Sequence, residues 1–127
     1  ITDFRQVSGI VDLASVERNT RATPACFVIP ESESAEANKH DGGYITQRRT
    51  NIIATVVAVR NGRHAGGADG HSELETIRNQ VIAKLVGWKP TDADTMVQFK
   101  SGRRLLFNNT TLWWVDQWRC HDYISRG

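Results

Sequence analysis

The residues able to hold a metal ion are few and widely separated. They are the cysteines Cys26 and Cys120 and the histidines His40, His64, His71 and His121. Zinc sites usually contain close ligand pairs such as C-x-x-C or H-x-x-x-H. His64 and His71 are seven positions apart across several glycines, and Cys120 and His121 are adjacent, so neither spacing forms such a pair. These positions favour surface histidines and buried thiols, and no metal site is predicted.

An activated nucleophile is not indicated either. Ser72 and Ser101 lie near histidine or basic residues, but neither occupies a G-x-S-x-G elbow. Cys120, His121 and Asp122 are consecutive, and consecutive side chains of a strand point to opposite faces. A catalytic triad is assembled in space, so this run does not form one locally. We therefore predict that the protein is not an enzyme.

Residues 61–70 (NGRHAGGADG) have the glycine content of a phosphate-binding loop and precede a helical pattern. A P-loop also requires G-x-x-x-x-G-K-[ST], in which lysine reaches the outer phosphates and a hydroxyl group holds magnesium. Neither that motif nor the dinucleotide-binding motif G-x-G-x-x-G is present. The segment is interpreted as a turn between a strand and a helix, and no cofactor is predicted.

Basic pairs and tryptophans are the remaining combination with a known use. The residues are Arg48 with Arg49, Arg103 with Arg104, and Trp113 with Trp114. Proteins that bind single strands combine a basic groove with stacking aromatic side chains. The net charge of +2 is low for that function, and the tryptophans could instead fill the core while the arginines are solvated. A nucleic-acid-binding module stays as a minor alternative.

The composition indicates one globular domain. A chain of 127 residues with 39% hydrophobic and 24% charged residues is long enough for a single core. Two cysteines fit a reducing compartment better than a disulfide-rich secreted domain. No apolar run reaches the roughly 18 residues that span a bilayer. No signal peptide is predicted from the start ITDFRQ, because it lacks an apolar stretch. The chain begins with Ile1, which is compatible with missing N-terminal residues.

One helix is strongly predicted over about residues 71–86. Its apolar residues follow helical spacing and are Leu74, Ile77, Val81, Ile82, Leu85 and Val86. Ser72 and Glu75 have the spacing of a capping box. Gly87 stands where a left-handed residue ends a helix, and Pro90 prevents continuation.

The strongest strand pattern covers residues 44–60. Its first half is polar on both faces, and its second half, from Ile52 to Val59, is apolar on both. We therefore expect a central strand that is covered on each face, with a polar half that projects as an arm or sheet extension. Residues 25–29 predict a strand closed by Pro30. Residues 31–43 (ESESAEANKHDGG) predict an exposed loop that is long for a compact domain.

The remaining elements complete an α+β pattern. Residues 4–16 predict a first strand that runs into a helical turn. Residues 96–100 and 103–108 predict two strands joined by a tight turn at Ser101-Gly102, and residues 112–120 predict a last strand. The expected fold is a mixed, mainly antiparallel sheet of four to five strands, with the helix at about 71–86 and a second, N-terminal helix packed on it. Residues 1–127 form one domain, with an exposed loop or arm at about residues 31–50.

Four tryptophans exceed what so small a core requires. Residues 112–118 are apolar on both faces, and only one face can cover the helix. The other face needs a second helix or a partner subunit. Aromatic residues and arginine are enriched in the cores of interfaces, which favours an assembly protein. The candidate interface residues are Tyr44, Thr46, Arg48, Arg49, Arg103, Arg104, Trp113 and Trp118.

The order of several short motifs resembles the tail terminator proteins of long-tailed bacteriophages. The matching segments are Val7-Ser8-Gly9 with Asp12-Leu13-Ala14, the "P-A-x-F-V-x-P" strand at residues 24–30, the "L-x-G-W-x-P" element at 85–90, Phe99 with Ser101-Gly102-Arg103, and Leu112-Trp113-Trp114-Val115-Asp116. They follow one another with the family's spacing over nearly the whole chain. Members commonly have a helix before the first motif, and its absence from this sequence is consistent with a clipped N-terminus.

The resemblance implies a structural virion protein that forms a ring of six copies. The ring would cap the head-proximal end of the tail tube, stop its polymerisation and join the tail to the head connector. The implied partners are further copies of the chain, the tail tube protein and the head-tail connector protein, with no membrane and no specific nucleic acid, although the genome would pass through the ring. The implied location is the tail–neck junction, after assembly in the host cytoplasm. Another neck protein, for tail completion or head closure, is the closest alternative.

Overall fold

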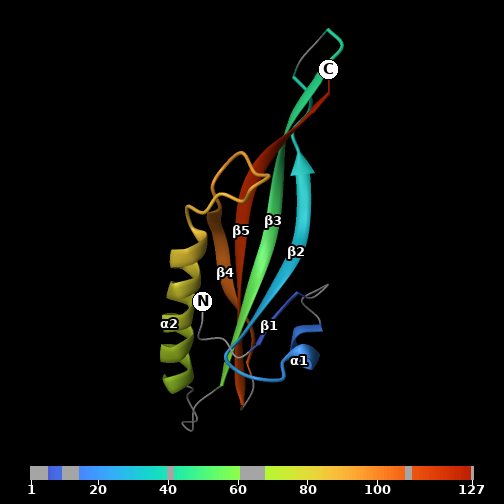
Figure 1. Cartoon of the computed structure of the whole chain (residues 1–127). Helices are drawn as coiled ribbons and strands as arrows, with labels where there is room; N and C mark the ends of the chain where they lie inside the picture. Colours follow the sequence, from blue (N-terminus) through green and yellow to red (C-terminus); the bar gives the residue numbers. More distant parts are fainter. Residues whose placement is uncertain (1–5, 10–14, 40–41, 61–67, 108–109, 127) are drawn as a thin grey trace.

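The structure, a computed structural model, describes residues 6–9, 15–39, 42–60, 68–107 and 110–126. Its elements in chain order are β1 (Gln6–Gly9), α1 (Val16–Asn19), β2 (Ala25–Ala35), β3 (Ile45–Arg60), α2 (Ala68–Leu85), β4 (Gln98–Phe107) and β5 (Thr111–Arg126). The strands form one five-stranded sheet in the order β1-β2-β3-β5-β4 (Figure 1). Of the strand pairs described, β1–β2 is parallel and the others are antiparallel. The predicted α+β fold with a mixed, mainly antiparallel sheet is confirmed.

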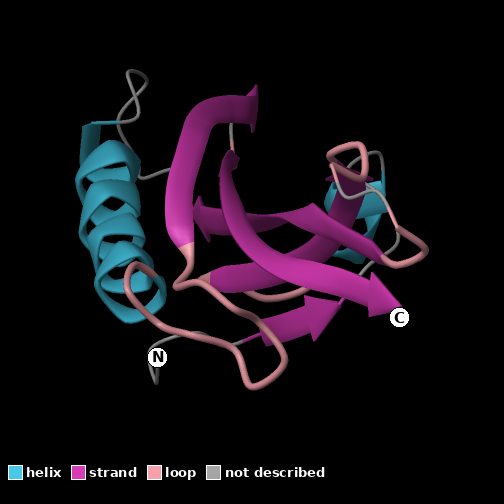
Figure 2. Cartoon of the chain, turned by 90° about the horizontal axis from the view of Figure 1, so that it is seen from above, coloured by secondary structure: helices cyan, strands magenta, loops and turns pink. Residues whose placement is uncertain are grey.

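β3 is the central strand of the sheet, as its pattern predicts. It lies between β2 and β5, and all six residues from Ala54 to Val59 are buried. Successive residues of a strand face opposite sides, so an unbroken buried run requires cover on both faces. The two helices supply that cover from opposite sides of the sheet, as the view from above shows (Figure 2).

α2 covers one face and closes the larger core. Its buried residues Leu74, Ile77 and Val81 pack with Val57, Val59, Val97, Leu112 and Trp118. The prediction of a helix over 71–86 is confirmed, although the helix begins three residues earlier, at Ala68. Gly87 follows its end with φ of 85°, the left-handed conformation expected at that position.

The opposite face carries a second core in which α1 takes part. Val16 of α1 packs with Phe27 and Ile29 of β2, together with Trp113 and Val115 of β5. In the part of the chain that the structure describes, this single turn is the helix on the N-terminal side. The second face of β5, expected to need either another helix or a partner subunit, is therefore buried within the subunit at these positions.

β2 is longer than its pattern predicts. The expectation that Pro30 closes the strand and that a loop begins at Glu31 is wrong, because β2 continues to Ala35 and pairs there with Arg49. The register shifts between Pro30 and Ser32. Proline lacks an amide proton, and at an edge strand a bulge of this kind absorbs the missing hydrogen bond.

The predicted hairpin at Ser101-Gly102 is also wrong. β4 runs without interruption through both residues, which pair with Gln117 and Asp116 of β5. Gly102 is required for close approach rather than for a turn, as described below. Most of the predicted turn at 61–70 lies outside the described residues.

Three strands continue beyond the two helices as an arm. We define the arm as residues 31–35 of β2, 45–52 of β3 and 119–126 of β5, and the last residues of the chain lie near its tip (Figure 1). β5 extends six residues past its predicted end at 120, because it pairs with the polar half of β3 as far as Ile45. Residues 45–53 of β3, which include this polar half, are exposed or only partly buried. Within the described ranges, no helix is long and apolar enough to cross a membrane.

Candidate assembly surfaces

The two cysteines lie far apart in the sheet. Cys26 pairs with Val57 and Cys120 pairs with Asn51, six positions apart along β3, which corresponds to roughly 20 Å. Both thiols are free. Burial raises the pKa of Cys26 to about 11, and burial together with Asp122 raises the pKa of Cys120. Both are therefore protonated and poor nucleophiles near neutral pH.

Cys120, His121 and Asp122 do not act together. The His121 ring contacts Thr50, with Nδ1 3.0 Å from Oγ1. Asp122 lies on the other face, where its Oδ1 accepts a hydrogen bond of 2.8 Å from Nε of Arg49. That hydrogen bond lowers the pKa of Asp122, whereas burial first, and then Arg48 and Arg119, lower the pKa of His121. No proton relay connects these side chains.

The residue types able to bind a metal ion are not brought together where they can be placed. Over the described ranges, no group of three or more His, Cys, Asp or Glu side chains is arranged to hold a metal ion. His40 and His64 lie outside these ranges, and the side chain of His71 is not described.

A buried ion pair fastens α2 to the sheet. Arg78 of α2 donates to Asp116 of β5 through Nε at 3.0 Å and through a terminal guanidinium nitrogen at 2.7 Å. Trp114 donates from Nε1 to the same carboxylate at 3.0 Å, and the Arg78 guanidinium lies 4.4 Å from the Trp114 ring centroid. We call Arg78, Trp114 and Asp116 the α2 clamp. Asp116 is fully buried, and its charge is matched inside the subunit, so this group is structural.

Gly102 makes room for the α2 clamp. A Cβ atom at this position would lie 2.4 Å from Oδ1 of Asp116 and 2.9 Å from Nε1 of Trp114. Sequence patterns did not identify the clamp. The available signal was an aspartate between Trp114 and Trp118 in an otherwise apolar strand, since a buried carboxylate needs a partner.

Two of the predicted interface residues belong to the interior of the subunit. Trp118 is completely buried and donates from Nε1 to Oγ1 of Thr55 at 2.9 Å. Trp113 is buried in the second core and donates to Oγ1 of Thr20 at 3.1 Å. These indoles are not available to a partner in this structure.

Four other predicted interface residues belong to β3 or immediately precede it. Tyr44 and Ile45 are exposed at the tip of the arm, and the backbone N–H of Thr46 donates to the side-chain oxygen of Asn38 at 3.0 Å. Arg49 forms the ion pair with Asp122 on one face of the arm. Arg48 points to the other face, where its buried Nε atom has no hydrogen-bond partner among the described residues.

The arginines of β4 are remote from those of the arm. Arg103 pairs with Val115 of β5, whereas Arg48 pairs with Tyr123. These β5 residues are eight positions apart, a distance of roughly 26 Å. With Trp113 buried as well, the basic pairs and tryptophans do not form the single groove that a nucleic-acid-binding module would require.

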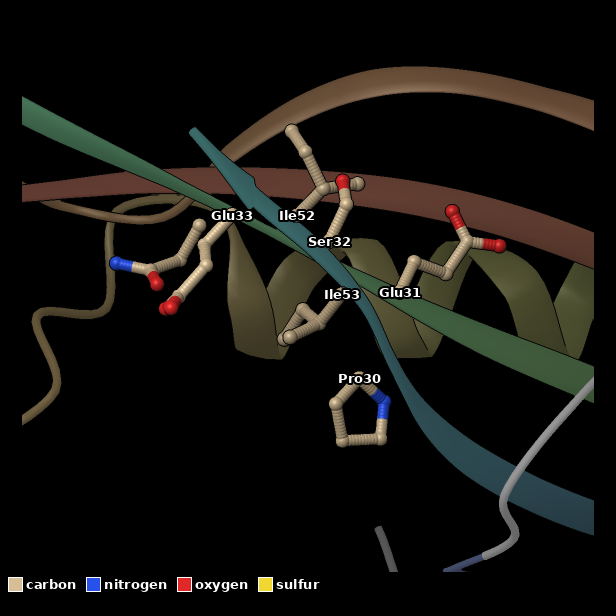
Figure 3. A pocket seen from close by; sticks show the side chains of 7 residues that line it. Pro30, Glu31, Ser32, Glu33, Ile52 and Ile53 are labelled. Carbon is tan, nitrogen blue, oxygen red and sulfur yellow. The ribbon is translucent and has the colours of Figure 1, made fainter. Parts of the chain in front are cut away.

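Two surface features were not predicted. The side chains of Trp88 and Met96 are 53% and 58% exposed. The two residues are brought near each other by backbone hydrogen bonds from Gly87 to Val97 and from Val97 to Trp88. A shallow hollow of about 270 Å³ lies at the β2 bulge between Pro30 and Glu33. Figure 3 shows Glu31 and Glu33 extending away from one another there, which is unsuitable for paired-carboxylate chemistry.

The protein is thus of a definite class, a small α+β fold that carries its distinctive features on a projecting arm and two sheet edges. The chain belongs to the phage tail terminator protein family, whose family model matches residues 1–126. No curated protein matches the chain. The protein is therefore a structural protein of the bacteriophage tail and a component of the virion, in a family that is structural rather than enzymatic.

Proposed function

We propose that the protein forms a ring on the head-proximal end of the tail tube, stops tube polymerisation and joins the tail to the head connector. The observation that carries this proposal is membership of the tail terminator family along almost the entire chain. The partners are further copies of the chain, expected as a hexamer, together with the tube protein and the connector protein. The ring is assembled in the host cytoplasm and occupies the tail–neck junction.

The sheet has a geometry suited to ring formation. Its two edges are different strands, so that contact between unlike edges is heterologous, and such contacts close into a ring when the rotation per subunit is right. A closed ring has two unlike axial faces. One face would complement the last ring of the tube and the other would complement the connector. The ring would thus cover the tube end without presenting a surface to which further tube subunits can add.

The arm is the element that we propose reaches a neighbouring subunit or the tube. Exposed apolar side chains lie on both faces of the arm near its tip. Ile45 and Ile124 share one face, Tyr123 lies on the other, Tyr44 immediately precedes β3, and each is at least 40% exposed. Exposed apolar groups at neighbouring positions are typical of contact surfaces. Of the arm residues only Cys120 packs against a core, so contacts near the tip can change without loss of the fold.

The test is capping of purified tail tubes, observed by negative-stain electron microscopy. We expect the wild-type protein to bind one end of each tube and to stop further growth. The double variant Tyr44→Ser/Ile124→Ser should fold normally but cap poorly. Val7→Ser, at an exposed apolar residue of β1, is the matched control and should cap as well as wild type.

The possible outcomes separate the two claims. If wild-type protein leaves tube growth unchanged, the proposed function is overturned, and binding to the connector alone would favour a head-closure protein. If wild type caps the tubes and the arm variant caps them equally well, only the role of the arm is lost.

A further inference from the structure

The two edges of the sheet carry opposite charge. Residues 29–36, at the β2 edge, contain Glu31, Glu33 and Glu36 and no lysine or arginine. Residues 98–107, which form β4, contain Lys100, Arg103 and Arg104 and no acidic residue. We call these the acidic edge and the basic edge. The whole chain has a net charge of only +2, so this separation is local and is not a result of composition.

Both edges are open over much of their length. β1 pairs with β2 only at Ala25 to Val28, so the outer side of β2 from Ile29 to Ala35 has no partner strand among those described. β4 is the terminal strand on the opposite side of the same sheet. An open edge presents unpaired backbone groups and can accept a strand from another chain.

Contacts inside the subunit hold Glu33, Glu36 and Lys100 only loosely, whereas the Glu31 carboxylate accepts a short hydrogen bond from Nε2 of Gln117 of β5. Glu33 lies 3.8 Å from Arg49 and has a side chain that is 64% exposed. Glu36 lies 3.9 Å from Lys39, and Lys100 donates to Gln117 at 3.3 Å. Exposed ion pairs at such distances contribute little free energy, so the carboxylates and the lysine can exchange these partners for others at low cost.

Charge on an edge strand often serves to prevent pairing. If the edge charges served to prevent pairing in this protein, charges of the same sign on both edges would keep all copies apart. Edges of opposite charge have a different effect. Two acidic edges repel, two basic edges repel, and one acidic edge attracts one basic edge. The arrangement therefore selects head-to-tail contact between copies and disfavours a symmetric dimer through either edge.

We propose that the acidic edge of each copy lies against the basic edge of the next copy, and that this is the lateral contact of the ring. The inference rests on the proposed function and names the surfaces that build it. Glu33 pairs with Asn51 of β3, which in turn pairs with Cys120 of β5, whereas Arg103 pairs with Val115 of β5. Glu33 and Arg103 are therefore offset by five positions along the direction of β5. Contact at one height therefore inclines the strands to the ring axis, as strands are inclined in closed barrels.

Charge reversal tests the contact directly. One variant, Glu33→Lys/Glu36→Lys, makes both edges basic, and another, Lys100→Glu/Arg103→Glu, makes both edges acidic. We expect each variant to be folded and to associate at least tenfold more weakly than wild type in sedimentation velocity, both alone and in the presence of tube ends. Glu73→Lys/Glu75→Lys, on exposed residues of α2, makes the same change in net charge as Glu33→Lys/Glu36→Lys and should associate like wild type.

Mixing the two reversed variants gives the decisive measurement. Every contact between a copy with two basic edges and a copy with two acidic edges is again attractive, so the mixture should form rings in which the variants alternate. A chain that carries all four substitutions should also assemble by itself. Raising the salt concentration should weaken all of these assemblies, because exposed charges are screened.

The results distinguish this inference from the proposed function. If wild type forms rings and both reversed variants form them equally well, or if the mixture fails to restore assembly, the edge contact is overturned while the capping function stands. If wild type forms no ring in solution or on tube ends, the ring itself is overturned and the edge contact with it.

Discussion

At Gly102 the absence of a side chain decides how β4 lies beside β5. The Ser101-Gly102 pair reads as a turn because glycine next to serine is common in tight turns. In the structure the chain runs straight through it, and the space above Gly102 is occupied by the α2 clamp. A local pattern contains no information on this use of glycine, since the atoms that require the space belong to α2 and β5.

Substitution of Gly102 by alanine should destabilise the protein by about 1–3 kcal/mol, the usual cost of overpacking. The added Cβ would lie 2.4 Å from a carboxylate oxygen that the Arg78 ion pair holds in place. The measurement is the free energy of unfolding in urea. Gly9→Ala is the control, because its Cβ would meet only the Val28 carbonyl oxygen at 3.9 Å. Equal stability of the two variants would show that the clamp has room to move.

The tryptophans also differ from one another as single residues in how deeply they are buried. Trp113 and Trp118 are core residues, and Trp88 is exposed on the surface. The sequence indicated a surplus of indoles without showing which of them is on the surface. Strand residues are buried only where another element covers their face, and that cover comes from distant parts of the chain.

At the scale of elements, the connection between α2 and β4 is anchored on β5 at His121. Its carbonyl oxygen accepts the backbone N–H groups of Asp94 and Thr95 at 2.8 and 3.2 Å, and its own N–H donates to Oγ1 of Thr95 at 2.9 Å. The ring is buried against Thr50 of β3. This residue therefore joins the connection to two strands at the base of the arm.

Acid should weaken this junction. The pKa of His121 is lowered in the folded state, mainly by burial, whereas an unfolded histidine has a pKa of about 6.5. The unfolded state then binds more protons, so the contribution of His121 to stability is complete above about pH 6.5 and is lost as the pH falls toward the folded-state pKa.

The measurement is the free energy of urea unfolding at pH 7.5 and at pH 5.5. Wild type should lose more stability between these values than His121→Gln does, because glutamine does not titrate. Comparing the two pH-dependent losses removes the effect of the other histidines. Identical losses in the two proteins would contradict the assignment.

Helices and strands were predicted correctly where the residue pattern within one segment was sufficient to identify the element. The periodicity of α2 and the doubly apolar half of β3 are local properties, and both predictions are confirmed. The ends of β2 and β5 were missed because their residues are polar. These segments are strands because β3 offers them backbone partners, and pairing of that kind is decided between segments rather than within one.

At the scale of the whole molecule, the protein has a body with two cores and an arm without one. Buried residues concentrate at positions 54–59 of β3, whereas residues 45–53 are exposed or only partly buried. Hydrophobic burial is the main source of stability, so the two halves of one continuous strand should differ in how readily they open.

Hydrogen exchange should reveal this difference along β3. We expect amides of residues 54–59 to exchange only on global unfolding and those of residues 45–50 to exchange roughly tenfold faster or more, because regions with few buried apolar contacts open locally. Ring assembly should slow exchange in the arm if the arm contacts a neighbour. Uniform protection along the strand would contradict the division into body and arm.

Local periodicity and an ordered set of family motifs were enough to predict the α+β class, the central strand, the long helix and an assembly protein. Tertiary structure alone decided which tryptophans are buried, why Gly102 has no side chain and that acidic and basic residues occupy opposite edges of one sheet. These properties depend on residues far apart along the chain, and only the pairing of strands and the packing of helices on them brings such residues to a common place.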